Sequence, residues 1–206
     1  MTSSKPRDPM KDELLSPDNS VFVLIDYQPT QVNSINSMDR HQLIESVTAL
    51  TAMIKSYQVP IILSTVNVTN GRNQDTIPQL KELLTDVPSY DRTSINAWED
   101  ADFKAALEAT GRKKIIIAAL WTEACLTFPA LDALKEGYEV FPVVDAVGGT
   151  SVIAHETALR RVEQAGAQLS SFAQIACEFQ RDWNRTETVP LFIKAMQEKG
   201  IFLKLK

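Results

Sequence analysis

Short apolar runs alternate with longer helical patterns along most of this chain of 206 residues. Such alternation is typical of βαβ units, in which crossover helices join parallel strands. Two of the runs, Val59–Val66 and Lys113–Leu120, are largely apolar without a break instead of apolar at every second position. Strands have this composition when helices cover both faces of a parallel sheet. The sequence therefore predicts an α/β fold with three layers, αβα, similar to a Rossmann fold.

We expect six strands in a mostly parallel sheet. The predicted strands are Ser20–Asp26, Val59–Val66, Val87–Arg92, Lys113–Leu120, Tyr138–Asp145 and Ala167–Phe172. The predicted helices are Arg40–Tyr57, Thr76–Leu84, Glu99–Thr110, Glu123–Glu136, Ser151–Gln164 and Val189–Lys199. Between a helix and the next strand stand Gly111, Gly137 and Gly166. A residue in the left-handed conformation, usually glycine, commonly ends a helix at such a place.

The division of the chain follows from its linkers. No stretch rich in Pro, Gly or Ser separates two halves, so we expect one domain over residues 18–185. A polar N-terminal extension, residues 1–17, precedes this domain. Residues 186–206 supply a C-terminal helix and a tail outside the βα alternation, and we expect this segment at a subunit interface.

The overall charge and the N-terminal sequence exclude several classes of partner. A formal net charge of -5 provides no basic surface for a phosphate backbone, so we expect a small-molecule substrate and no nucleic acid. The first residues are polar and lack the apolar core of a signal peptide or an anchor, which favours a cytoplasmic protein without membrane contact. Two cysteines, without a CxxC motif, suit a reducing compartment.

Three chemically active side chains follow predicted strands, where open α/β sheets bind their ligands. Asp26 ends the run VFVLID, Arg92 ends the short third strand, and Cys125 opens the helix that follows IIIAALWTEAC. We expect all three to face one crevice.

Cys125 is the candidate nucleophile. The first turn of a helix has unpaired amides and a positive dipole end, which stabilise a thiolate and lower the pKa of a cysteine. The alternative is a small buried core residue, because free cysteine is among the most buried residue types. We interpret Cys177, which lies far from any predicted strand end, in that second way.

Asp26 and Arg92 each have a structural alternative. Desolvation at the end of a buried strand raises the pKa of a carboxyl group and suits Asp26 to general-base catalysis, whereas an aspartate there also caps turns. Arg92 supplies a permanent charge for an anionic intermediate, or else forms a surface salt bridge. The histidines, His41 and His155, do not follow strands, which disfavours a Cys/His dyad.

Motifs for metals and phosphates are missing from the sequence. The segment after the second strand, TVNVTNGRNQ, has no cluster of aspartate and histidine, and no glycine-rich phosphate loop occurs. We therefore expect neither a cofactor nor a metal.

With these residues in place, the chain resembles the isochorismatase-like cysteine hydrolases, which include nicotinamidases and N-carbamoylsarcosine amidohydrolase. The resemblance covers residues 18–175. It is carried by VFVLIDYQ, by RTSINAW, by the block IIIAALWTEACLTFPALDALKEGYEV, and by VVDA at Asp145. The nucleophile block is the most specific of the four motifs.

The resemblance implies a mechanism. Asp26 takes the proton of Cys125, the sulfur attacks the carbonyl carbon of an amide, and water hydrolyses the resulting thioester. It also implies a cis peptide bond between Leu120 and Trp121, with the amides of Trp121 and Cys125 as the oxyanion hole. Gln28, Trp98 and Trp121 are candidates for the substrate pocket, although aromatic residues at strand ends often belong to the core.

The sequence departs from the family pattern at two places. Arg92 occupies the position usually held by lysine and cannot readily pass a proton, because its pKa exceeds about 12. The metal-ligand pattern of nicotinamidases is also missing. Within the family the chain resembles a bacterial branch of hydrolases without an assigned substrate, which implies a homo-oligomer, specifically an octamer.

Three functions stay open at this point. The first is cleavage of a small amide or related C–N bond through a thioester on Cys125, without a metal. The second is a binding or scaffold protein in which Cys125 is a redox-sensitive thiol. The third is isochorismatase-type cleavage of a vinyl ether, which the cysteine at position 125 disfavours.

Overall fold

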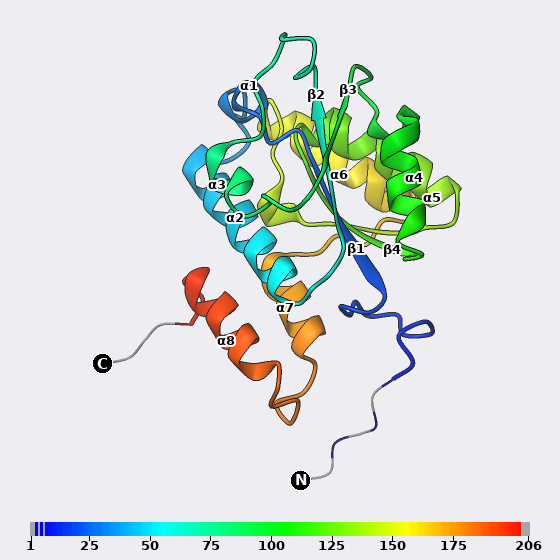
Figure 1. Ribbon diagram of the computed structural model, residues 1–206, viewed down its shortest axis with the longest axis vertical. Helices are drawn as coiled ribbons and strands as arrows, with labels where there is room; N and C mark the ends of the chain where they lie inside the picture. The colour runs from blue at the N-terminus through cyan, green and yellow to red at the C-terminus, as the bar shows by residue number, and fades with distance from the viewer. Residues whose placement is uncertain (1–2, 4, 6, 203–206) are drawn as a thin grey trace.

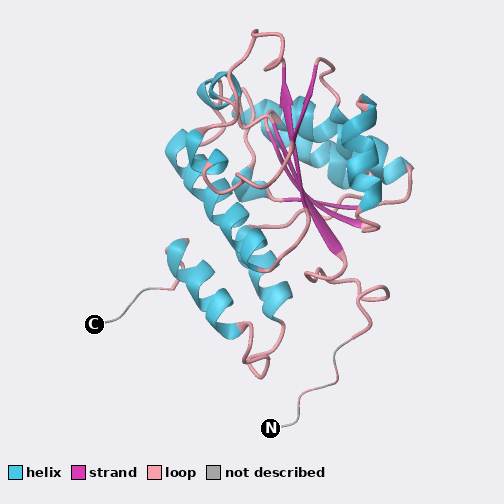
Figure 2. Ribbon diagram, viewed as in Figure 1, coloured by secondary structure: helices cyan, strands magenta, loops and turns pink. Residues whose placement is uncertain are grey.

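The strands of the protein form one parallel sheet with helices on both faces (Figure 2). A computed structural model describes residue 3, residue 5 and residues 7–202. The strand order is β3-β2-β1-β4-β5. The strands are β1 Ser20–Ile25, β2 Ile61–Val66, β3 Ser89–Arg92, β4 Lys114–Ala119 and β5 Glu139–Pro142. The predicted three-layer α/β fold is confirmed.

The helices follow the strands in the expected alternation (Figure 1). The longer ones are α2 Arg40–Ser56, α4 Ala101–Ala109, α5 Thr127–Lys135, α6 Val152–Gln164, α7 Phe172–Gln180 and α8 Val189–Glu198. The short ones are α1 Pro29–Asn33 and α3 Pro78–Lys81, with single turns η1 Ala97–Glu99, η2 Thr122–Leu126 and η3 Val144–Ala146. Helices α2 and α7 lie on one face of the sheet and α4 and α5 on the other.

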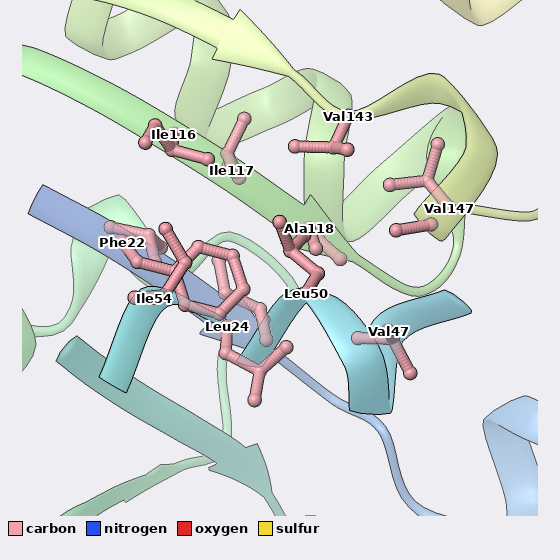
Figure 3. Packing of buried hydrophobic residues seen from close by; sticks show 14 of the residues in the cluster. Phe22, Leu24, Val47, Leu50, Ile54, Ile116, Ile117, Ala118, Val143 and Val147 are labelled. Atoms are coloured by element: carbon pink, nitrogen blue, oxygen red, sulfur yellow. The ribbon is translucent and has the colours of Figure 1, made fainter. Parts of the chain in front are cut away.

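The core covers both faces of the central strands, and one part of it lies between these strands and α2. Every residue of β1 and of β4 is buried, and β2 is buried at its four central residues. Burial of β2 and β4 is what their continuous apolar runs predict. Helix α2 turns Val47, Leu50 and Ile54 towards Phe22 and Leu24 of β1 (Figure 3). The spacing of three and four residues places these α2 side chains on one helical face. The core thereby holds the carboxyl end of β1 in a fixed position.

The prediction of a sixth strand is wrong. The chain near Ala167–Phe172 runs beside β5, with hydrogen bonds from Gln168 N to Val140 O at 2.8 Å and from Ser170 N to Pro142 O at 2.9 Å. Only one isolated bridge forms there, between Val143 and Ser170. The segment stops because Ser171 caps α7, accepting a hydrogen bond from Gln174 N. A helix therefore begins at Phe172 and the sheet has five strands.

The helix predicted over Glu123–Glu136 begins differently from an ordinary α-helix. Its first part is the π-helical turn η2, in which Leu126 N donates to Trp121 O at 3.2 Å, and α5 continues from Thr127. Such wide turns often occur at functional sites. The glycines predicted to end helices, Gly111, Gly137 and Gly166, all have positive φ, as expected.

The described parts of the two terminal segments pack on the domain. Leu15 is fully buried and its amide donates to Glu178 Oε2 of α7 at 2.6 Å. Arg181, after α7, donates to Asp12 Oδ2 at 2.8 Å. Helix α8 contacts α2 and α7 of the same chain. Of the predicted tail, residues 203–206 lie outside the described residues.

The strand order creates a switch point between β1 and β4. From β1 the chain moves outward through β2 and β3, and it then returns to β4 on the other side of β1. Ligands of open α/β sheets bind in the crevice at such a point, beyond the carboxyl ends of the strands. Within the described residues, no helix is both long and apolar enough to cross a membrane.

Candidate active site

Asp26 lies directly beyond the end of β1, at the switch point. Its amide donates to Ser64 O at 3.0 Å and its side chain is fully buried. The backbone is left-handed at this residue, with φ of 61°, a conformation that aspartate tolerates better than most residues. The alternative role as a turn cap does not apply, because both carboxylate oxygens bind Arg92.

Arg92 is the last residue of β3 and reaches across the end of β2 to Asp26. Its Nη1 donates to Asp26 Oδ1 at 2.8 Å and its Nη2 to Asp26 Oδ2 at 2.7 Å. The same two nitrogens also bind Ser64 Oγ, Thr65 O and Ile95 O. Burial lowers the pKa of Arg92, but the bonded carboxylate outweighs burial and the pKa is raised. The surface salt bridge is therefore excluded, since the side chain is 1% exposed.

Cys125 lies in η2, after the carboxyl end of β4, and is 7% exposed. Its thiol lies beside the carboxylate of Asp26, whose negative charge raises the pKa of Cys125. The structure therefore brings the three side chains predicted from strand ends into one contiguous site. Ser64 joins them as a contact of Arg92 that the sequence reasoning missed. Its signal was a polar residue in the apolar run IILSTV.

The environment of Cys125 reverses the expected direction of its pKa. Burial and the negative charge of Asp26 raise the pKa of the thiol well above its ordinary value. The charge of Arg92 and the amide of Trp121 oppose this rise without overcoming it. The expectation of a stabilised thiolate at a helix start is wrong, because burial of the thiol and, after it, the charge of Asp26 disfavour the thiolate. The resting cysteine is a thiol beside a carboxylate.

The segment before Cys125 has the geometry that the resemblance implies. The peptide bond between Leu120 and Trp121 is cis, and the Trp121 amide lies close enough to Cys125 to lower the pKa of its thiol, against the larger rise from burial. The indole Nε1 of Trp121 donates to Ser34 Oγ at 2.6 Å. This bond fixes the ring against the segment that follows α1.

The other candidates for the substrate pocket have structural contacts. Gln28 is fully buried and its amide group bonds Val66 N, Val66 O and Gln74 O. It therefore anchors the loop after β2. The ring of Trp98 packs edge-on against Phe103 and Tyr138, and its Nε1 donates to Glu136 Oε1 at 2.9 Å. Those contacts are the ones that the core alternative predicts for Trp98.

The other residues singled out from the sequence lie elsewhere. Cys177 is exposed on α7, so its interpretation as a buried core residue is wrong. Asp145 accepts a hydrogen bond from Phe172 N, at the start of α7. His41 is exposed and pairs with Glu45 along α2. His155 lies near the site, because its Nδ1 is 2.8 Å from Thr122 Oγ1 in η2.

The polar groups of the site are a thiol, a carboxylate and a guanidinium. Over residues 3, 5 and 7–202, no three side chains of His, Cys, Asp or Glu are grouped so that they could hold a metal ion. A thiol beside a carboxylate that can accept its proton has the groups needed for attack on a carbonyl carbon.

Comparison with known proteins gives the family. Residues 20–174 match the isochorismatase domain. The probable hydrolase YcaC of Escherichia coli K12 is 38% identical over 170 residues, covering 82% of this chain and 81% of the relative. The crystal structure of Escherichia coli YcaC, described as an octameric hydrolase of unknown specificity, superposes with a TM-score of 0.86 at 34% identity. The superposition covers 95% of this chain and 93% of the Escherichia coli YcaC chain.

A second solved structure is YcaC from Pseudomonas aeruginosa with hexane-2,5-diol and covalent acrylamide. Its TM-score is 0.81 at 31% identity, with 91% of this chain and 98% of the other covered. These matches agree with the fold described above. The chain therefore belongs to the isochorismatase family of hydrolases.

Proposed function

We propose that the protein is a metal-independent cysteine hydrolase that cleaves an amide-type C–N bond of a small molecule. One observation carries the proposal. The thiol of Cys125 lies beside a buried carboxylate, Asp26, which raises the pKa of the thiol and which Arg92 holds in place through two bonds. A nucleophile, a base within hydrogen-bonding reach and a group that orients the base form the arrangement that covalent hydrolysis requires.

In the first half-reaction, Cys125 forms a bond to the carbonyl carbon of the substrate. Its proton moves to Asp26 as the sulfur attacks, because the resting thiol is protonated. The carbonyl electrons pass to the oxygen, and we assign the amides of Trp121 and Cys125 to bind that oxyanion. The C–N bond then breaks, the leaving nitrogen takes the proton from Asp26, and a thioester remains on Cys125.

In the second half-reaction, Asp26 takes a proton from water as the water oxygen attacks the thioester carbon. The oxyanion forms again at the same two amides. The C–S bond breaks, the sulfur recovers the proton from Asp26, and the carboxylic acid leaves. Arg92 takes no proton in either half, since guanidinium stays charged at any working pH. Its role is to orient Asp26 and to keep positive charge near the site.

The proposal also includes the oligomeric state of the protein and its cellular compartment. We expect a homo-oligomer, an octamer like that of the Escherichia coli relative, with residues 186–206 at a subunit interface. The chain is expected to work in the cytoplasm, where its two cysteines stay reduced. We make no assignment of a particular amide.

A panel of small amides, carbamoyl compounds and amides derived from nitriles tests the activity, with ammonia release as the measurement. The proposal expects release from at least one compound by the wild-type protein and none by Cys125→Ala. Ammonia release that survives Cys125→Ala would contradict it. Absence of release from every compound would favour the binding protein with a reactive thiol, and consumption of isochorismate by Cys125→Ala would favour vinyl-ether cleavage.

A further inference from the structure

The short segment from Trp121 to Cys125 contains both amides assigned to the oxyanion. Thr122, in this segment, is fully buried and uses all its polar groups. Its amide donates to Gly148 O at 2.9 Å, and its carbonyl accepts from Thr127 Oγ1 at 2.6 Å. Its hydroxyl is 2.8 Å from His155 Nδ1. The first bond reaches the loop at Gly148, and the second stays within the local chain. The third bond connects η2 to helix α6.

The start of α6 is in tight contact with the same segment. Ser151 caps the helix by accepting from Ala154 N, and His155 lies one turn further on. A Cβ atom added to Gly149 would lie 2.6 Å from Glu123 Oε2 and 3.0 Å from His155 Cβ. The carboxylate of Glu123 could move aside, but the contacts with His155 leave little room for a side chain at this position. The loop before α6 therefore packs closely against Glu123 of η2 and His155 of α6.

Glu123 strengthens this contact from the other side. Its Oε1 accepts from Thr150 N at 3.0 Å and from Thr150 Oγ1 at 2.6 Å. Gly149 O in turn accepts from Asn36 N at 3.0 Å. The loop before α6 is thus bonded both to the nucleophile segment and to the segment after α1. His155 provides the only side-chain hydrogen bond from α6 itself to η2 among the described residues.

The chemistry of His155 fits a structural bond better than proton transfer with Cys125. Burial lowers the pKa of His155, against the nearby charges of Glu123 and Glu156, so the ring is neutral at neutral pH. Its described bond goes to the Thr122 hydroxyl, and the carboxylate beside Cys125 is that of Asp26. A neutral imidazole can donate or accept at Nδ1, and the threonine hydroxyl rotates to match either state.

We propose that His155 is a positioning residue for the hydrolysis, which holds the Trp121 amide in place for the oxyanion through its bond to Thr122. This inference rests on the proposed function. It predicts that loss of the bond slows steps that form an oxyanion and leaves other reactions of Cys125 nearly unchanged. The distinction separates positioning of the amide from a general effect on the site.

Two reagents make the distinction in a Cys177→Ser background, where Cys125 is the single cysteine. With 4-nitrophenyl acetate, the sulfur attacks a carbonyl, an oxyanion forms, and 4-nitrophenolate leaves to give an acetyl thioester. With iodoacetamide, the sulfur displaces iodide from a saturated carbon and no oxyanion forms. The ratio of the two second-order rate constants therefore measures the oxyanion contribution.

His155→Ala should lower the rate of acylation about tenfold or more, part of the roughly 10²–10³ that an oxyanion donor contributes. Alkylation should change by no more than about twofold, the scatter of independent substitutions. Thr122→Val, which removes only the hydroxyl from the same bond, should give the same loss, with no further loss in the double variant. His155→Asn, which keeps a polar group near the Nδ1 position, should recover most of the acylation rate.

His41→Ala is the matched control, because His41 is an exposed histidine on α2 whose described pair is with Glu45. It should change neither rate. The inference is overturned if Thr122→Val and His155→Ala leave acylation unchanged, or if acylation and alkylation fall together. Failure of the proposed function has a different signature, namely 4-nitrophenolate release at the full rate from Cys125→Ala.

Discussion

The two terminal nitrogens of Arg92 bind the two oxygens of Asp26 separately, at 2.8 and 2.7 Å, with both side chains almost completely buried. This pairing fixes the plane of the carboxylate beside the thiol of Cys125. A guanidinium presents two parallel donors to a carboxylate, which a lysine cannot do. Arg92, which stands where the resemblance implies a lysine, therefore holds the Asp26 carboxylate in a more rigid orientation than a lysine would.

Replacement of Asp26 should change the pH dependence of Cys125 alkylation. The charge of Asp26 raises the pKa of the thiol, and Arg92 lowers it. Asp26→Asn removes the raising charge and leaves the lowering one, so the alkylation profile should move to lower pH. Iodoacetamide should then react faster near neutral pH. The same variant should lose amide hydrolysis, since nothing protonates the leaving nitrogen. A profile displaced to higher pH would contradict the assigned charges.

Arg92 should be important for stability as well as for orientation. Arg92→Met leaves the Asp26 carboxylate buried without its partner, and loss of one member of a buried pair costs about 3–5 kcal/mol. The free energy of unfolding in urea should fall by that amount. Arg92→Lys keeps the charge and one bond, so it should cost less. Equal unfolding midpoints for Arg92→Met and the wild-type protein would show that the pair of Arg92 and Asp26 contributes nothing to the free energy of unfolding.

The two cysteines should react in an order opposite to the one that sequence alone favours. Cys177 is exposed, whereas Cys125 is buried with a raised pKa. Because the thiolate is the reactive form, acrylamide near neutral pH should label Cys177 first, and Cys125 should follow as the pH rises. Peptide mass spectrometry over time separates the two sites. Faster labelling of Cys125 would indicate a thiolate that the described environment does not explain.

Trp98 should behave as a core residue. Trp98→Phe removes the bond to Glu136 and part of the packing on Phe103 and Tyr138. Large-to-small changes of this kind cost about 1–3 kcal/mol in a well-packed interior. The melting temperature should fall while the alkylation rate of Cys125 stays the same. A change in the alkylation rate without a change in stability would place Trp98 in the substrate pocket instead.

Most of the fold was predictable from the sequence because its signals are local. Continuous apolar runs gave β2 and β4, and glycines gave the ends of three helices, where the structure has positive φ. The prediction of a sixth strand was wrong for a local reason too, since α7 begins at the cap residue Ser171 and leaves no room for a full strand before it. No periodic pattern distinguishes a single bridge from a full strand.

The same distinction between local signals and tertiary contacts applies to the candidate site. Residues that follow strands, namely Asp26, Arg92 and Cys125, were identified from position in the α/β alternation. The direction of the Cys125 pKa was wrong, because burial and the charge of Asp26 arise only when distant segments meet. His155 was set aside as a helical residue, and only the packing of α6 on η2 brings it to Thr122. Tertiary contacts of this kind leave no pattern in one sequence.

The most direct test of the account is to trap the covalent intermediate. The Cys177→Ser protein is mixed with 4-nitrophenyl acetate, quenched in acid and digested. The mass of the peptide that contains Cys125 is then measured by mass spectrometry. The account predicts one acetyl group on Cys125, removed by hydroxylamine as a thioester is, and no 4-nitrophenolate burst from Cys125→Ala. An unmodified Cys125 peptide, with the full rate of release in Cys125→Ala, would contradict the claim that Cys125 is the nucleophile.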